Sequence, residues 1–146
     1  MIYSENGLAL TKHFEGLSLH AYQDQGGVWT IGYGHTGPDV VEGILITAVH
    51  AEDLLRNDVM SAENCVNRAL KVAITQNQFD ALVDFAFNLG IGNFLGSTLL
   101  RKVNTEDFLA AAGEIPRWNH VNGNVSDGLT RRRQAEKDLF EGKPWQ

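Results

Sequence analysis

Three side chains in the first fifth of the chain are suited to acid–base chemistry. Glu15 is followed nine residues later by Asp24, and Thr30 comes six residues after that. Two carboxylates can serve as general acid and general base, and a hydroxyl beside the base can hold a water molecule. Hydrolysis of a glycosidic bond requires this combination. Each residue alone is more typical of a structural position, so the hypothesis depends on their joint spacing.

A helix end is expected to position Glu15. Residues 4–14 carry apolar side chains at helical spacing, and Gly16 is suited to end the helix. Glu15 then lies in the last helical turn, where the helix dipole disfavours a negative charge. This placement helps to keep a carboxylic acid protonated.

A hairpin is expected to position the other two side chains. Residues 19–36 alternate loosely in polarity and contain several glycines, which predicts a β-hairpin or a small three-stranded sheet. A turn at Gly26 and Gly27 would place Asp24 just before the turn. Thr30 would lie across from it on the returning strand.

The remainder of the chain predicts mainly helices, hence an α+β fold that is mostly helical. Thr47 begins an apolar helical stripe of about 23 residues, and a capping box at Thr75 begins a central helix that runs to Leu89. Further helices are expected at 94–103, at 106–112 with Thr105 as cap, and at 128–140, with a polar loop at 119–128. The predicted core residues are Leu54, Phe79, Leu82, Ala86 and Trp118.

Length and composition narrow the class of protein. The 146 residues fit one domain, and the net charge of −6 argues against a nucleic-acid partner. There is no apolar run long enough for a transmembrane helix and no recognisable signal peptide. The single cysteine, Cys65, excludes an internal disulfide.

Several spaced motifs together resemble one known family. The spacing of Glu15, Asp24 and Thr30, with TIGYGHT from Thr30 onward, is similar to the catalytic signature of phage-type lysozymes. These are endolysins, muramidases of glycoside hydrolase family 24. Later segments match in the same order, so the resemblance spans nearly the whole chain: QNQFDALVDFAFNLG (76–90), GST (96–98) and GLTRRRQAEKDLF (128–140).

The resemblance implies a lysozyme-like architecture. The chain would form a single catalytic domain, 1–146, with a small β-lobe at about 15–46 and a helical lobe made of 1–14 and about 60–146. The long helix from Thr47 would join the lobes, with a cleft between them.

The resemblance also implies an activity, which is hydrolysis of the β-1,4 bond between N-acetylmuramic acid and N-acetylglucosamine. Glu15 would be the general acid, while Asp24 and Thr30 would activate water, with inversion at the anomeric carbon. Two alternatives are a lytic transglycosylase, which needs only the glutamate, and a non-enzymatic wall-binding or phage structural module.

Supporting roles also follow from the resemblance. An arginine would pair with Glu15, and this role falls on Arg131, with Arg132 as the alternative. Helix phase predicts that Arg133 points outward. His35 is expected to form a structural ion pair with Asp58.

No metal or cofactor is expected, because the five histidines show no metal-ligand spacing. Peptidoglycan is the expected partner, without nucleic acid or a membrane anchor. Family resemblance implies a monomer that waits in the host cytoplasm and reaches the wall after a holin opens the inner membrane.

Overall fold

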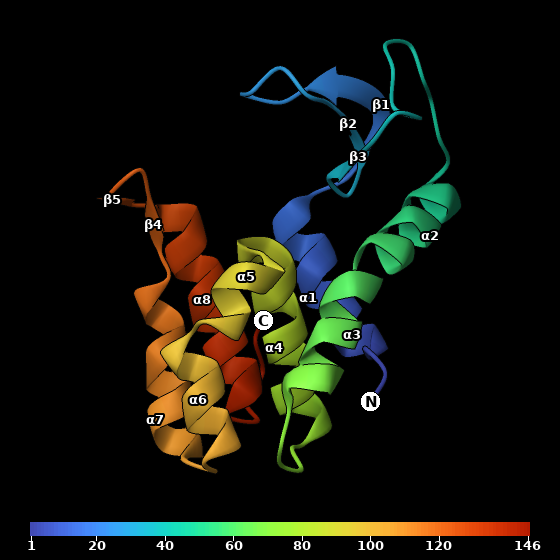
Figure 1. Ribbon diagram of the computed structural model, residues 1–146. Helices are drawn as coiled ribbons and strands as arrows, with labels where there is room; N and C mark the ends of the chain where they lie inside the picture. Colours follow the sequence, from blue (N-terminus) through green and yellow to red (C-terminus); the bar gives the residue numbers. More distant parts are fainter. The chain divides into compact units, whose positions relative to one another are not determined.

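The computed structural model describes all residues, 1–146, and the chain divides into two compact units (Figure 1). Unit 1 comprises Met1–Leu10 and Ser61–Gln146, and unit 2 comprises Thr11–Met60. The secondary structure is mostly helical with small antiparallel sheets, which confirms the predicted α+β class. No helix is both long and apolar enough to cross a membrane. The expected cleft between two lobes stays a prediction.

Unit 2 is built on a three-stranded sheet and one helix. The strands pair antiparallel in the order β1-β2-β3, so the segment forms the three-stranded sheet, one of the two arrangements predicted from the sequence. Ile31 of the central strand, Ala51 and Leu55 are each at most 2% exposed and form the core of this unit. The elements are the end of α1 (Glu5–Glu15), β1 (Ser18–Gln23), β2 (Trp29–Gly32), β3 (His35–Thr36) and α2 (Ala48–Asp58).

Unit 1 is a helical assembly around α4 (Gln76–Leu89). The capping box predicted at Thr75 is present, since its hydroxyl accepts from the backbone of Gln78 and the Gln78 side chain accepts from Thr75. Gly90 ends the helix with φ of 97°. The other elements are α3 (Met60–Ala69), α5 (Ile91–Leu95), α6 (Thr98–Asn104), α7 (Phe108–Glu114), the 3-10 helix η1 (Ile115–Arg117), β4 (His120–Val121), β5 (Asn124–Val125) and α8 (Asp127–Phe140).

The core predictions are confirmed at three positions and wrong at two. Phe79, Leu82 and Ala86 are at most 1% exposed. Leu54 is only half-buried, because its neighbour Leu55 takes the inward position on α2. Trp118 is also half-buried, although its ring packs edge-on against Phe85 with centroids 5.7 Å apart.

The single helix predicted from Thr47 is wrong, because it is interrupted at Val59. Thr47 does cap α2, accepting from the backbone N–H of His50 at 3.1 Å. The N–H of Val59 still bonds to Leu55 O, and α3 begins at the next residue. Apolar residues continue at a spacing of three or four across Val59, so the periodicity of the sequence does not reveal the interruption.

The helix predicted at 94–103 is also wrong and consists of α5 and α6. Ser97 separates them, donating its hydroxyl to Phe94 O at 2.7 Å and accepting from the N–H of Leu100 at 3.1 Å. This N-cap begins a new helix, since a serine side chain satisfies donors that have no partner in the first turn.

Two further boundaries differ from the prediction. Thr105 ends α6 rather than starting a helix, and Asp107 caps α7 by accepting from the N–H of Ala110 at 3.3 Å. The predicted loop 119–128 contains the hairpin β4-β5, whose turn residue Asn122 has φ of 51°. Asn and Gly together favour such a tight hairpin turn.

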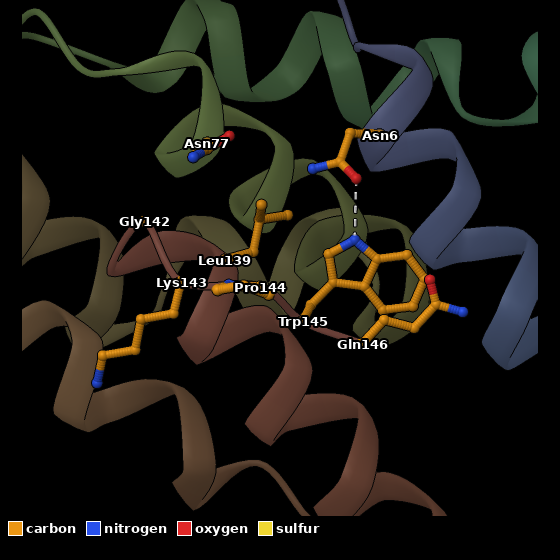
Figure 2. A pocket seen from close by; sticks show the side chains of 8 residues that line it. All are labelled: Asn6, Asn77, Leu139, Gly142, Lys143, Pro144, Trp145 and Gln146. Carbon is orange, nitrogen blue, oxygen red and sulfur yellow. Dashed lines mark hydrogen bonds between the residues drawn. The ribbon is translucent and has the colours of Figure 1, made fainter.

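The first helical turns and the last residues of the chain meet within unit 1. The indole Nε1 of Trp145 donates to Asn6 Oδ1 of α1 at 3.0 Å (Figure 2). The residues before α1 contact two other helices: the N–H of Tyr3 donates to Glu63 of α3 at 2.6 Å, and the Ser4 hydroxyl donates to Asp80 of α4. These contacts fix the start of the chain against α3, α4 and the C-terminal segment.

Candidate active site

Glu15 is the last residue of α1, as predicted. Gly16 follows with φ of 72°, and its N–H bonds to Lys12 O at 3.0 Å, which closes the last helical turn. The side chain of Glu15 is half-buried. The carboxyl group of Glu15 thus lies at the C-terminal end of α1.

The backbone of Gly34 lies against the carboxyl of Glu15. A methyl group at Gly34 would lie 2.9 Å from Glu15 Oε1, inside van der Waals contact, and Gly34 has φ of 82°. Glycine alone satisfies both constraints, because it has no Cβ and adopts positive φ without strain. The turn between β2 and β3 therefore meets the end of α1 at the glutamate. The sequence hypothesis missed Gly34, although its place in GYGH was a signal.

Asp24 begins the turn between β1 and β2. Its Oδ1 accepts from the backbone N–H of Gly26 at 2.8 Å and of Val28 at 2.9 Å. The N–H of Gly27 bonds to Asp24 O, and Gly27 has φ of 79°, so the loop is a β-turn followed by a residue in the left-handed region. These bonds fix the aspartate and use only one carboxylate oxygen. They leave Oδ2 on an exposed side chain available to a water molecule.

Thr30 lies on β2 and is 4% exposed. Its hydroxyl donates to Val28 O at 2.9 Å, so the oxygen can still accept a hydrogen bond from water. The expected position directly across from Asp24 is wrong, because the register pairs Thr30 with Tyr22. The turn occupies Asp24 to Val28, which places the aspartate two residues beyond that pair.

His35 forms the expected ion pair with Asp58, with Nδ1 2.8 Å from Oδ2. Its other ring nitrogen, Nε2, lies 3.0 Å from Oδ2 of Asp39, a partner that the sequence hypothesis missed. Burial lowers the pKa of His35, but hydrogen bonds and charge from Asp58 and Asp39 outweigh burial and raise it. The histidine thus links β3 both to α2 and to the following loop.

The three consecutive arginines of α8 differ in their surroundings. Arg131 is exposed. Its predicted pairing with Glu15 stays a prediction. Arg132 binds Asp84 of α4, with Nε and Nη2 donating to Oδ2 and Oδ1 at 2.9 and 2.8 Å. Arg133 is fully buried, so the prediction that it points outward is wrong.

A buried carboxylate explains the inward position of Arg133. Its Nη2 donates to Glu136 Oε2 at 2.9 Å and to Asn88 Oδ1 at 2.7 Å, and its guanidinium lies 5.4 Å from the centroid of the Phe85 ring. Burial raises the pKa of Glu136 well above its usual value, and the neighbouring Asp84 raises it further. The positive charges of Arg133 and Arg132 lower this pKa but do not outweigh burial. Asp84 and Glu136 are acids on apolar helix faces, which apolar periodicity alone does not reveal.

The structure groups most of the predicted site residues in one unit. Glu15, Asp24, Thr30, His35 and Asp58 all belong to Thr11–Met60, whereas Arg131 belongs to the other unit. No group of three or more His, Cys, Asp or Glu side chains is arranged to hold a metal ion. Unit 2 thus holds both carboxyl groups and the hydroxyl group of the predicted acid–base chemistry.

Comparison with known proteins identifies the class. The sequence matches the family model described as phage lysozyme over residues 12–136. The chain therefore belongs to the phage lysozyme family, and its fold is that of a solved phage endolysin structure.

Individual relatives agree with this assignment. The endolysin of Bacillus phage PZA is 51% identical over 142 residues, covering 96% of this chain and 55% of that protein. The chain thus spans about half the length of that relative. The structure of an endolysin from Escherichia coli O157:H7 phage FAHEc1 aligns with a TM-score of 0.91 at 41% identity, covering 96% of this chain and 93% of the other. The muramidase domain of SpmX from Asticcacaulis excentricus aligns with a TM-score of 0.88 at 44% identity, covering 94% and 96%.

Proposed function

We propose that this chain is an endolysin-type muramidase that hydrolyses the β-1,4 bond between N-acetylmuramic acid and N-acetylglucosamine in peptidoglycan. One structural observation supports the proposal most directly. The same small sheet that bears Asp24 and Thr30 places Gly34 against the carboxyl of Glu15. Membership of the phage lysozyme family and similarity to a muramidase domain support the choice of substrate.

Glu15 acts as the general acid. It protonates the oxygen of the leaving sugar while the bond to the anomeric carbon breaks. Its place at the end of α1 brings the carboxyl group to the turn between β2 and β3. The backbone of Gly34 limits the positions open to the carboxyl, and this preorganises the proton donor.

Asp24 and Thr30 prepare the attacking water. The water donates one hydrogen to the free oxygen of Asp24 and the other to Thr30 Oγ1, whose own hydrogen is engaged by Val28 O. The lone pair of the water is then directed at the anomeric carbon, and Asp24 takes the proton as the new bond forms. This assignment makes the reaction inverting, because the water attacks the face opposite the leaving group.

Arg131 is proposed to contact Glu15 when the enzyme works, with Arg132 as the alternative by resemblance. The bidentate bond of Arg132 to Asp84 favours Arg131 for this role. From resemblance to endolysins, we further propose that the enzyme is a monomer. It would accumulate in the host cytoplasm and reach the wall once a holin has opened the inner membrane.

Digestion of purified peptidoglycan by the native enzyme and by Glu15→Gln tests the activity. The native enzyme is expected to release muropeptides with reducing N-acetylmuramic acid ends, and the variant to lose nearly all turnover while keeping its fold. Anhydro-muramyl ends would instead identify a lytic transglycosylase. Absence of any product from the folded native protein would leave only a wall-binding role.

Access to the wall needs a separate test, in cells that express the enzyme with or without a holin. Cells without the holin should remain intact until chloroform opens the inner membrane, and should then lyse. Lysis without holin or chloroform would contradict the proposed route.

A further inference from the structure

Three cationic side chains line one pocket of unit 1. The pocket has a volume of about 600 Å³ and is formed by the end of α3, the segment after it, the α5–α6 junction and α6. Arg68, Lys71 and Arg101 contribute the charge, and no acidic residue lines it. All three are exposed, so their charged groups can reach a ligand from solvent.

These cations differ from most others in the same unit because none of them forms an ion pair. Their positive charge is therefore not neutralised by the protein, in a chain whose net charge is −6. The cations of unit 1 that do pair with carboxylates are Arg117, Arg132, Arg133, Lys137 and Lys143. An unneutralised group of three cations in a concave site attracts an anion more strongly than scattered surface charges do.

The wall of the pocket is fixed by a side chain that belongs to it. Asn104 Nδ2 donates to Ala69 O at 3.0 Å, and Asn104 Oδ1 accepts from the N–H of Lys71 at 2.8 Å. One amide therefore joins α6 to the segment that carries Lys71, and the neighbouring Ser97 is itself fixed by two hydrogen bonds. The backbone under the cations is thus held in place before any ligand arrives, which reduces the entropy lost on binding.

We propose that this pocket binds a phosphate group of an anionic polymer in the bacterial cell wall. Two guanidinium groups and one ammonium supply more positive charge than a single carboxylate would neutralise, and guanidinium matches the oxygens of phosphate in pairs. A concave site admits a group that projects from a polymer chain, whereas a flat lipid surface would not enter it. The choice of a wall polymer rests on the proposed function, but the anion site itself does not.

The site gives the enzyme a second way to hold its insoluble substrate. Catalysis requires only the glycan strand, while the pocket would bind phosphate carried by a polymer attached to that strand. The effective concentration of the enzyme at the wall then rises without any change in the catalytic groups. The two activities are separable, because no residue of the pocket is one of the proposed catalytic residues.

Titration calorimetry with an oligomer of glycerol phosphate tests the site directly. The native chain is expected to bind the oligomer, and affinity should fall as salt increases. Arg68→Gln and Arg101→Gln should each weaken binding by about tenfold or more, as for loss of a charge-assisted hydrogen bond. The control is Lys102→Gln, which removes a cation of α6 that lies outside the pocket and should leave affinity unchanged.

Several outcomes would overturn the proposal. These are no binding by the native chain, an equal loss in Lys102→Gln, or equal affinity for glutarate, a dicarboxylate without phosphate. Tighter binding to phosphatidylglycerol vesicles than to the oligomer would assign the pocket to lipid instead. Hydrolysis of wall stripped of phosphate polymers should be the same for native and variant enzymes, so failure of the site and failure of the proposed activity would be distinguishable.

Discussion

Arg132 and Asp84 are joined by two parallel hydrogen bonds in the interior of unit 1. The guanidinium donates from Nε and Nη2 at 2.9 and 2.8 Å, and the side chains are 5% and 0% exposed. Two facing helices, α4 and α8, are thus joined by a charged pair that water does not reach. Such a pair is costly to break, because removal of one partner leaves the other charge buried without compensation.

Asp84→Asn should therefore lower the free energy of unfolding by about 3–5 kcal/mol. Urea unfolding at neutral pH measures the change. The matched control is Glu114→Gln, which breaks the exposed pair with Arg117 and should cost at most about 1 kcal/mol. A loss below 1 kcal/mol in Asp84→Asn would show that the buried pair contributes little beyond its desolvation.

The ion pairs of His35 predict a pH dependence of stability. The folded-state pKa of His35 is raised, so its contribution is fully present below about pH 6.5 and is lost as pH rises through the raised value. The free energy of unfolding should decline over that interval, and His35→Gln should abolish the decline. NMR titration of the imidazole should show a lowered pKa in Asp58→Asn and in Asp39→Asn.

The control for this titration is His120→Gln, which removes a histidine of the β4-β5 hairpin in the other unit. It should leave the titration of His35 unchanged. If neither Asp58→Asn nor Asp39→Asn altered that titration, the two carboxylates would not act on the histidine in solution.

Gly34→Ala should damage both stability and turnover. The added methyl meets Glu15 Oε1 at 2.9 Å, and φ of 82° strains any side chain. Displacement of a catalytic group by about 1 Å can lower turnover by about 10²-fold. Gly43→Ala is the matched control, since it has φ of 85° in the same unit but nothing within 4 Å of the new methyl. The control should lose stability but keep its turnover on soluble peptidoglycan fragments.

Thr30→Val should lower turnover by about 10²-fold or more, because the water loses a hydrogen-bond acceptor with little change in side-chain volume. Stability should change by at most about 1–2 kcal/mol. Thr36→Val alters the residue that pairs with Thr30 on β3 and serves as the control. Near-native turnover in Thr30→Val would remove this threonine from the mechanism.

The first product should carry the α-configuration at its new reducing end. An inverting enzyme fits a water between base and sugar, and its carboxyl groups stand about 6.5–9.5 Å apart rather than about 5–5.5 Å. NMR of the nascent product, recorded before mutarotation, distinguishes the two anomers. A β-anomer appearing first would make Asp24 a nucleophile and would contradict its role in activating water.

The sequence predicted those features that local chemistry determines. Gly16 after α1, the cap at Thr47 and the capping box at Thr75 were correct, because each depends on a few neighbouring residues. Arg133 was wrongly placed because its inward position depends on two buried polar partners, Glu136 on the same helix and Asn88 on the facing helix. Apolar periodicity treats every arginine as a polar position, so it has no means to detect a buried one.

The candidate site shows the same distinction. Spacing and family motifs identified Glu15, Asp24 and Thr30, but the actual pairing of Thr30 with Tyr22 depends on the loop. Asp24 begins that loop, because its Oδ1 accepts hydrogen bonds from the N–H groups of Gly26 and Val28. The strand register is therefore shifted by two residues from the predicted hairpin, in which Asp24 lay across from Thr30. Asp39 was missed because it reaches His35 only after the chain turns beyond β3.

The division of the chain into units implies an order of completion during synthesis. Unit 2 is one continuous segment, whereas unit 1 needs Met1–Leu10 together with Ser61–Gln146. At 5–20 residues per second, roughly 4–17 s separate the synthesis of residue 60 from that of residue 146. During that interval, Tyr3 and Ser4 wait for Glu63 and Asp80, and Asn6 waits longest, for Trp145. The sheet that bears Asp24 and Thr30 can therefore form on the ribosome before the helical unit has all of its chain.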